Sequence, residues 1–425
     1  MLTGTAWIAI AIFVAVYSII VSEKIHRTKI ALMGAVALLL VKVMPQEEAI
    51  GKIDFNTLGL LTGMMIIVAI AMRTGMFEYM AVYLAKMVKG NPAKIMTVFF
   101  TFTAVTSALL DNVTTVLLVT PIIFSITATL KINPIPFLIS EILASNIGGT
   151  ATLIGDPPNI MIGGAVGLGF NEFIINLAPV VIVIGVLTNW LFNRIYRKEL
   201  VGNPEAERSI MAMDEASYLQ NPALLKKVIA VLTVTIVGFA LHKVLHLESA
   251  TIAMGGAAAL LLISRIEPEE IFKELEWNTL FFFIGLFIVV GGLEVTGVIK
   301  MIAVWGLSIT QSDIALLNYL ILWLSAIASA FIDNIPFVAT MIPLIKSMAE
   351  VGGIDVSTLW WALSLGACLG GNGTIIGASA NVVVSSIAAG KGYPMTFLGY
   401  MKIAFPLMLV SIVICHAYIY VRYLM

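Results

Sequence analysis

Long runs of apolar residues, each about the length of a membrane-spanning helix, alternate along this chain with short polar segments. A helix of about 20 apolar residues crosses the hydrocarbon core of a bilayer, so the pattern predicts a protein that crosses a membrane many times. Two stretches of mixed polarity, 76–92 and 294–312, predict amphipathic helices near the membrane surface. The apolar segments are about 5–21, 30–44, 56–72, 95–110, 113–130, 134–168, 173–193, 226–247, 250–264, 278–293, 314–332, 335–349, 356–389 and 396–421.

Composition leads to the same class of protein. The chain is 60% hydrophobic and only 12% charged, whereas soluble domains carry about 25% charged residues. We therefore expect an all-α polytopic membrane protein. The net charge of -1 gives no indication of nucleic-acid binding. Both cysteines, Cys368 and Cys415, lie in apolar segments, which predicts neither a disulfide framework nor a metal site.

The two halves of the chain are repeats with a constant offset of 222 residues. Asp111-Asn112 is matched by Asp333-Asn334, and Gly148-Gly149 by Gly370-Gly371. Self-similarity at a fixed offset indicates two copies of one structural unit. The first predicted unit is 1–195, with scaffold helices at about 5–92, a hairpin at about 95–130 and a broken helix at 134–168. A polar linker follows at 196–225. The second predicted unit is 226–425, with a hairpin at about 314–349 and a broken helix at 356–389.

The number of crossings decides how the copies are oriented. Each unit has about five membrane-crossing helices plus one hairpin, and an odd number of crossings turns the second copy upside down. Charge agrees with this inversion: with the N-terminus outside, 18 Lys and Arg fall in cytoplasmic loops and only 6 outside, as the positive-inside rule requires. We expect two inverted repeats in the cell membrane (inner or plasma membrane), with the central linker cytoplasmic.

The segment 95–130 is too long for a single crossing, since 36 residues of helix would span roughly 54 Å. It must fold back at Asp111-Asn112. One interpretation is two full spans joined by a surface turn. The other is a re-entrant hairpin with its tip near the middle of the bilayer, which the Ser and Thr residues on both sides of the tip favour. The second copy turns at Asp333-Asn334.

A second polar interruption lies at 146–159, inside another apolar segment. It contains glycines, two asparagines, Asp156 and Pro157-Pro158. Proline removes a backbone donor and disfavours helix before it, so a helix must unwind here. Unwound backbone at membrane depth is tolerated only where it lines protein or a water-filled cavity. A small-residue packing face would explain the glycines, but not the acid, the prolines or the equivalent pair Asn159 and Asn381.

Three acids lie within these interruptions, and acids inside a membrane are by default functional. Asp111, Asp156 and Asp333 could bind a cation, exchange a proton or cap a helix N-terminus. The hairpin acid occurs in both halves, whereas Asp156 corresponds to Ala378. We therefore expect Asp156, with Asp111 and Asp333, to carry proton or cation coupling.

At these residues the chain resembles a known family. The stretches 110–115 and 146–159 are similar to those of the ArsB/NhaD permeases of the ion transporter superfamily, and most similar to the branch of the melanosomal P protein and bacterial ArsB-like permeases. The resemblance implies an elevator-type fold with discontinuous helices and a homodimer. It implies a substrate or ion site formed by Asp111, Asn112, Thr114, Thr115, Asn146, Gly148, Gly149, Thr150, Asp156 and Asn159 in the first half and by Asp333, Asn334, Asn372, Gly373, Thr374, Ser379 and Asn381 in the second.

The hairpin tips depart from those of related dicarboxylate carriers, which have Ser-Asn-Thr there. This chain has Asp-Asn-Val at 111–113 and Asp-Asn-Ile at 333–335. Acids repel a multivalent anion, so the tips favour a cation, a proton or a neutral hydroxide such as arsenite.

The leading hypothesis is a secondary transporter that exports arsenite or antimonite, driven by protons or the membrane potential. The alternatives are a Na⁺/H⁺ antiporter and a Na⁺-coupled carboxylate or anion transporter. No cofactor is expected beyond the coupling ion, H⁺ or Na⁺, and a separate ATPase subunit stays open as a partner. No hydrolase or metalloprotease motif is present in the sequence, which argues against an enzyme.

Overall fold

The computed structural model describes residues 3–22 and 24–425, and it is built from helices. Within the described residues, 10 helices are long and apolar enough to cross a membrane. The prediction of a multi-pass helical membrane protein is confirmed. These helices are α1 (Gly4–Ser22), α4 (Phe55–Met72), α6 (Pro92–Leu109), α7 (Asn112–Leu130), α10 (Phe170–Ile195), α12 (Pro222–Leu245), α15 (Trp277–Val295), α17 (Ile314–Phe331), α18 (Asn334–Gly352) and α21 (Phe397–Ile419), the last of which continues in a π-helical turn to Leu424.

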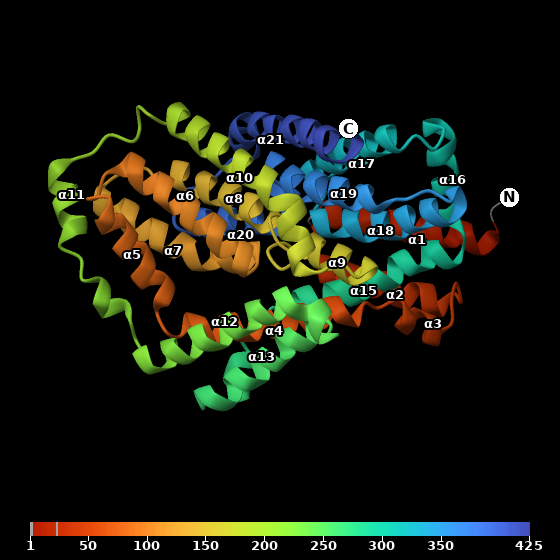
Figure 1. Ribbon diagram of the computed structural model, residues 1–425, viewed down its shortest axis with the longest axis horizontal. Helices are drawn as coiled ribbons and strands as arrows, with labels where there is room; N and C mark the ends of the chain where they lie inside the picture. Colours follow the sequence, from red (N-terminus) through yellow and green to blue (C-terminus); the bar gives the residue numbers. More distant parts are fainter. Residues whose placement is uncertain (1–2, 23) are drawn as a thin grey trace.

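Shorter helices fill the gaps between these spans. Two of them, α3 (Gln46–Gly51) and α14 (Pro268–Phe272), each begin at or next to a proline and have a pair of glutamates in their first turn, where acids favour the positive end of the helix dipole. The polar linker also contains a helix, α11 (Pro204–Met211), which lies at the far end of the molecule from the N-terminus (Figure 1). The others are α2 (Arg27–Leu40), α3 (Gln46–Gly51), α5 (Met76–Met87), α8 (Ile135–Thr150), α9 (Pro157–Val166), α13 (Ser249–Ser264), α14 (Pro268–Phe272), α16 (Val298–Thr310), α19 (Ser357–Gly370) and α20 (Ser379–Gly390).

The repeat is visible in the packing of its glycines. A Cβ on Gly63 would lie 2.6 Å from the backbone of Ala253, and a Cβ on the equivalent Gly285 would lie 2.6 Å from the backbone of Ala31. Only glycine permits helices to approach this closely. The two contacts connect equivalent positions of the two halves, so both halves use one packing design.

Equivalent helices lie at opposite ends of the molecule, as the predicted inversion requires. α5 and α16 occupy the same place in their repeats, and they lie at opposite ends of the molecule (Figure 1). The scaffold is also interlocked between repeats: α1 and α2 pack against α15, whereas α12 and α13 pack against α4. We call these six helices the outer group.

The remaining long helices surround the two broken ones. α8 packs against α6 and α7, α19 packs against α17 and α18, and α8 and α19 contact each other. Almost every residue of α8 and α19 is buried. We call α6–α10 and α17–α21 the central group. The two hairpin tips and the two helix breaks all belong to it.

Candidate functional site

Both broken helices unwind where the sequence predicts. α8 ends at Thr150 and α9 begins at Pro157. In the second half α19 ends at Gly370, two short 3-10 turns follow, and α20 begins at Ser379. The prediction of discontinuous helices is confirmed.

Two asparagines hold the unwound segments in place. Asn159 Nδ2 donates to the carbonyl oxygens of Thr150 and Thr152 at 3.1 and 2.9 Å. The equivalent Asn381 Nδ2 donates to those of Gly371 and Thr374 at 2.7 and 2.8 Å. Carbonyls freed by a helix break are costly if buried without a partner. Both asparagines therefore supply the backbone hydrogen bonds that the missing turn would have made.

Several predicted site residues have a packing role. A Cβ on Gly148 would lie 2.0 Å from the Ala104 carbonyl oxygen, and one on Gly149 would lie 2.4 Å from that of Gly155. A Cβ on Gly373 would meet the side chain of Ala330 at 2.7 Å. Thr374 Oγ1 donates to the Ala330 carbonyl, which fastens the break to the hairpin. These residues position the site without presenting a functional group to it.

Both hairpin acids cap the helix that follows them. Asp111 Oδ1 accepts a hydrogen bond from the Thr114 backbone nitrogen at 2.8 Å, and Asp111 Oδ2 accepts one from the Thr114 hydroxyl. Asp333 Oδ1 accepts from the Ile335 nitrogen at 3.0 Å. Capping is the structural role that acids at this position commonly have. Asp333 has further partners, described below.

A cluster of asparagines lies where the two halves meet. Asn112 Nδ2, at the first tip, donates to Asn146 Oδ1 at 3.0 Å. Asn146 Nδ2 in turn donates to Asn372 Oδ1 at 3.0 Å and to Asn381 Oδ1 at 2.9 Å, both in the opposite half. All four side chains are buried. Amides can both donate and accept, so the cluster suits a solute that carries hydroxyl groups.

The first tip also presents polar atoms that have no partner. Among the described residues, Asn112 Oδ1 and Thr115 Oγ1 are buried and accept or donate no hydrogen bond. Buried polar atoms are normally satisfied, and exceptions call for an explanation such as an absent ligand. These two oxygens lie beside the asparagine cluster and are candidates to contact a bound solute or ion.

Asp156 is the most unusual side chain at the centre. It is 0% exposed and does not cap α9. Its two carboxylate oxygens each lie 3.3 Å from Asn334 Nδ2, at the tip of the opposite hairpin. No Lys, Arg or His of the described chain lies within ion-pairing distance. A buried carboxylate without a cation is costly to keep charged, so Asp156 requires a proton or a bound cation.

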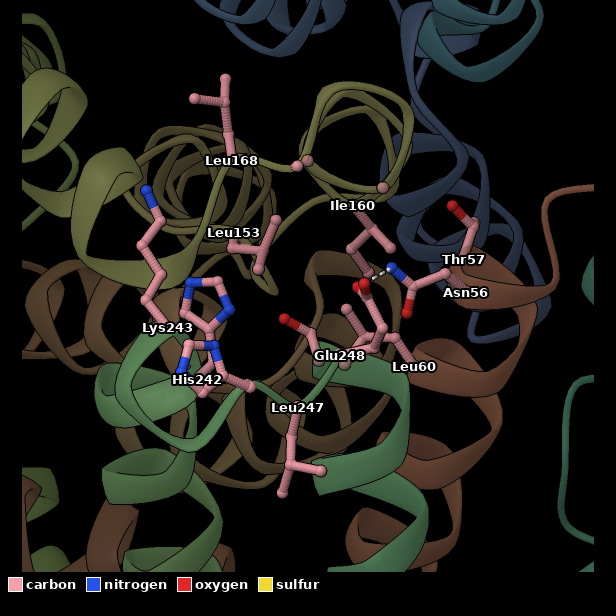
Figure 2. Close-up of a pocket in the computed structure, with 15 residues that line it drawn as sticks. Asn56, Thr57, Leu60, Leu153, Ile160, Leu168, His242, Lys243, Leu247 and Glu248 are labelled. Atoms are coloured by element: carbon pink, nitrogen blue, oxygen red, sulfur yellow. Dashed lines mark hydrogen bonds between the residues drawn. The ribbon is translucent and has the colours of Figure 1, made fainter.

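Three cavities lie between the outer and central groups. One, of 440 Å³, is lined by Arg27, Glu276, Asp333 and Ser379. Another, of 340 Å³, lies between α4, α9 and the turn that joins α12 to α13. Figure 2 shows Asn56 bonded to Glu248 on one side of it and His242 and Lys243 on the other. A third, of 560 Å³, lies between α9, α15 and α18.

Sequence reasoning missed four residues at the centre. Ser364 Oγ donates to Asn159 Oδ1 at 2.5 Å, Cys368 Sγ lies 3.5 Å from the same oxygen, and Tyr400 donates to the Asn372 carbonyl at 3.1 Å. Arg27 contacts Asp333 and Ser379. Cys368 could have been found, because it is the 222-residue equivalent of Asn146. Nothing in the sequence connects Arg27 with the second tip.

Known proteins resemble this chain over nearly its whole length. A family model described as a citrate transporter matches residues 17–366. The chain belongs to the citrate transporter family. It is a membrane transporter, and the resemblance to the branch of the P protein is confirmed. A protein of Mycobacterium bovis named only as an uncharacterized transporter is 41% identical over 98% of both chains. The human P protein is 34% identical, and the match covers 98% of this chain and 60% of the P protein.

The fold of the transporter also matches a solved structure. The crystal structure of the Alcanivorax borkumensis YdaH transporter, whose title describes an unusual topology, superposes with a TM-score of 0.61. The comparison covers 99% of this chain and 98% of that one at 13% identity. At this identity the likeness shows a common fold and carries no information about the substrate.

Proposed function

We propose that the protein is a secondary transporter that moves a small solute by alternating access and couples this movement to protons through Asp156. The observation that carries the proposal is the position of Asp156: buried, without a cation, and bonded to the hairpin of the opposite repeat through Asn334. A proton that binds there changes the charge at the contact between the two halves. Because Asp156 belongs to the central group, its protonation changes the charge that this group carries past the outer group, and protonation and movement are thereby linked.

The favoured substrate class is a small uncharged hydroxide such as arsenite or antimonite. The asparagine cluster offers donors and acceptors to hydroxyl groups, and the acids Asp111, Asp156 and Asp333 near it disfavour a multivalent anion. Export driven by protons or the membrane potential is the direction we propose. We also propose that the central group moves against the outer group as a unit, within a homodimer in the cell membrane.

A second candidate is Na⁺/H⁺ exchange. The unpartnered Asn112 Oδ1 and Thr115 Oγ1 are hard oxygen ligands of the kind that alkali and alkaline-earth cations prefer. Together with Asp156 they would form an oxygen-rich site. A third candidate, carboxylate uptake, is favoured by the description of the family as citrate transporters.

Flux into proteoliposomes separates these candidates. The purified protein is assayed with arsenite, Na⁺ and citrate, each with and without a pH gradient. We expect arsenite flux that the pH gradient drives, and a loss of about tenfold or more in Asp156→Asn, because the variant cannot exchange the proton. Thr129→Val, a half-exposed position at the far end of α7, is the control. Arsenite flux that persists unchanged in Asp156→Asn contradicts proton coupling at this residue, and flux of only Na⁺ or citrate contradicts the substrate.

A further inference from the structure

An ion pair connects the outer group to the tip of the second hairpin. Arg27 Nη1, at the first residue of α2, donates to Asp333 Oδ2 at 2.5 Å and to Ser379 Oγ at 2.6 Å. Ser379 Oγ in turn donates to Asp333 Oδ2 at 2.7 Å. One guanidinium nitrogen thus holds two elements of the central group together, the tip before α18 and the first residue of α20.

Arg27 is itself fixed to the outer group. Its guanidinium carbon lies 4.9 Å from the centre of the Phe282 ring on α15, a distance at which a cation is attracted to an aromatic face. Its neighbour Thr28 donates to the Asn278 carbonyl at 2.8 Å. The side chains of Arg27 and Asp333 are 27% and 13% exposed, and among the ion pairs of the described chain this carboxylate is the least exposed. Reduced exposure strengthens the pair relative to a surface ion pair.

The ion pair between the outer group and a hairpin tip forms at the second tip and has no equivalent at the first. The residue equivalent to Arg27 in the second repeat is Ser249, at the first residue of α13. A hydroxyl cannot form the same ion pair with Asp111, and no cation of the described chain lies within ion-pairing distance of Asp111. The outer group can therefore hold the second tip electrostatically but not the first.

We propose that Arg27 is a positioning residue of the transport cycle, which holds the central group at the end of the molecule where α2 begins and must release Asp333 before α18 and α20 can move. Glu276 lines the same cavity as Arg27 and Asp333. When the tip departs, Glu276 is the carboxylate of the outer group that remains to face the guanidinium. Arg27 thus biases the equilibrium toward one of its two states.

This inference rests on the alternating access proposed above, and cysteine alkylation tests it without any solute. Both native cysteines are buried, so they give little background reaction. Val383→Cys reports on the 440 Å³ cavity beside Arg27, and Ala165→Cys reports on the 560 Å³ cavity beside α9. In Arg27→Gln we expect alkylation to fall about fivefold at the first reporter and to rise about fivefold at the second, because the population shifts away from the held state.

Matched variants separate positioning from a loss of structure. Arg27→Lys keeps the charge and should restore part of the wild-type ratio between the two reporters. Lys29→Gln, an exposed lysine two residues along α2, should leave both rates unchanged. Ser379→Ala removes the hydroxyl group that bonds both Arg27 and Asp333. It should shift the ratio between the two reporters in the same direction as Arg27→Gln, by about twofold. This variant keeps the test available if Arg27→Gln does not fold.

Reporter rates that stay at wild-type values in Arg27→Gln, or that rise together as in a loosened fold, overturn the proposal. Because these rates are measured without arsenite and without a pH gradient, such a result leaves the flux experiment untouched. Conversely, absence of arsenite flux would contradict the proposed substrate while the reporter shift still identified Arg27 as a positioning residue.

Discussion

The second halves of the two broken helices, α9 and α20, are equivalent in sequence position but differ in their surroundings. α9 is covered from Pro157 to Gly163, and a Cβ on Gly164 would lie 2.7 Å from Asp54 Oδ2 at the start of α4. In α20, Ser379, Val382 and Val383 are only half-buried and line a 440 Å³ cavity. Pro157 at the start of α9 is thus buried, whereas the equivalent Ser379 at the start of α20 lines a cavity beside the outer group.

The residues that meet the outer group also differ between the two halves. The equivalent of Gly164 is Ser386, which is exposed, whereas the residue that meets the outer group in the second half is Ser379, seven positions earlier. Seven helical residues correspond to roughly 10 Å along the helix axis. The two copies thus meet the outer group through residues that are seven positions apart in the repeat, a difference that the alternating access proposed above would produce.

The packing that both halves share should be the most sensitive to mutation. A Cβ on Gly148 would lie 2.0 Å from the Ala104 carbonyl oxygen, and one on the equivalent Gly370 would lie 2.5 Å from that of Ala326. Backbone atoms cannot move aside, so Gly148→Ala and Gly370→Ala should each lower the free energy of unfolding by about 3 kcal/mol. Thermal unfolding of the detergent-solubilised protein measures this loss.

Gly390→Ala is the control, because a Cβ there would meet nothing within 4 Å. Equal melting temperatures for Gly148→Ala and Gly390→Ala would show that the helices are further apart than described. A large loss for Gly148→Ala alone would show that the second half tolerates a wider separation and that the common packing design holds only in the first.

The helix breaks and the internal repeat could be predicted from the sequence. Pro157-Pro158 and the glycines around them predicted the helix breaks, and the 222-residue offset predicted two copies of one unit. The roles of individual residues could not be predicted, because they depend on contacts between distant segments. Thr374 fastens the break to the hairpin, whereas Asn146 reaches across to the other repeat. The partner of Asp333 is 306 residues away in the chain, and no local pattern marks it.

The equivalent pair Asn146 and Cys368 offers a sharper test of the asymmetry. Asn146 makes three hydrogen bonds to other asparagines, whereas Cys368 has one weak contact at 3.5 Å to Asn159. Asn146→Cys makes the first half like the second and leaves buried amides without partners, which should cost about 2 kcal/mol. Cys368→Ser should cost less than about 1 kcal/mol.

Measurements of thermal unfolding and of solute flux in Asn146→Cys and Cys368→Ser test this prediction. We expect Asn146→Cys to lose both stability and flux, since the cluster connects the two halves, and Cys368→Ser to retain both. If the two substitutions have the same effect, the asparagine cluster is not the connection between the repeats that its hydrogen bonds indicate.

The acids that precede α4 and α15 give the smallest expected difference. Asp54 caps α4 through the backbone nitrogens of Asn56 and Thr57 at 2.9 and 3.1 Å. Its equivalent Glu276 precedes the first residue of α15 and makes no such cap. Burial, and then the negative charge of Asp111, raise the pKa of Glu276 to about 7, and the nearby Arg27 lowers it only in part.

A carboxyl group whose pKa is raised on folding stabilises the folded state most at low pH. For Glu276 the contribution is fully present below the ordinary pKa of about 4.5 and is lost as the pH rises through about 7. Glu276→Gln should therefore unfold at a higher temperature than the wild type at pH 8, whereas the two should unfold at the same temperature at pH 4. The gain in the free energy of unfolding at pH 8 should be only about 1 kcal/mol, because the cavity admits solvent. Glu267→Gln, on the preceding exposed turn, controls for removal of one negative charge. An equal gain in both variants at pH 8 would mean that net charge, rather than the surroundings of Glu276 at the open cavity, accounts for the effect.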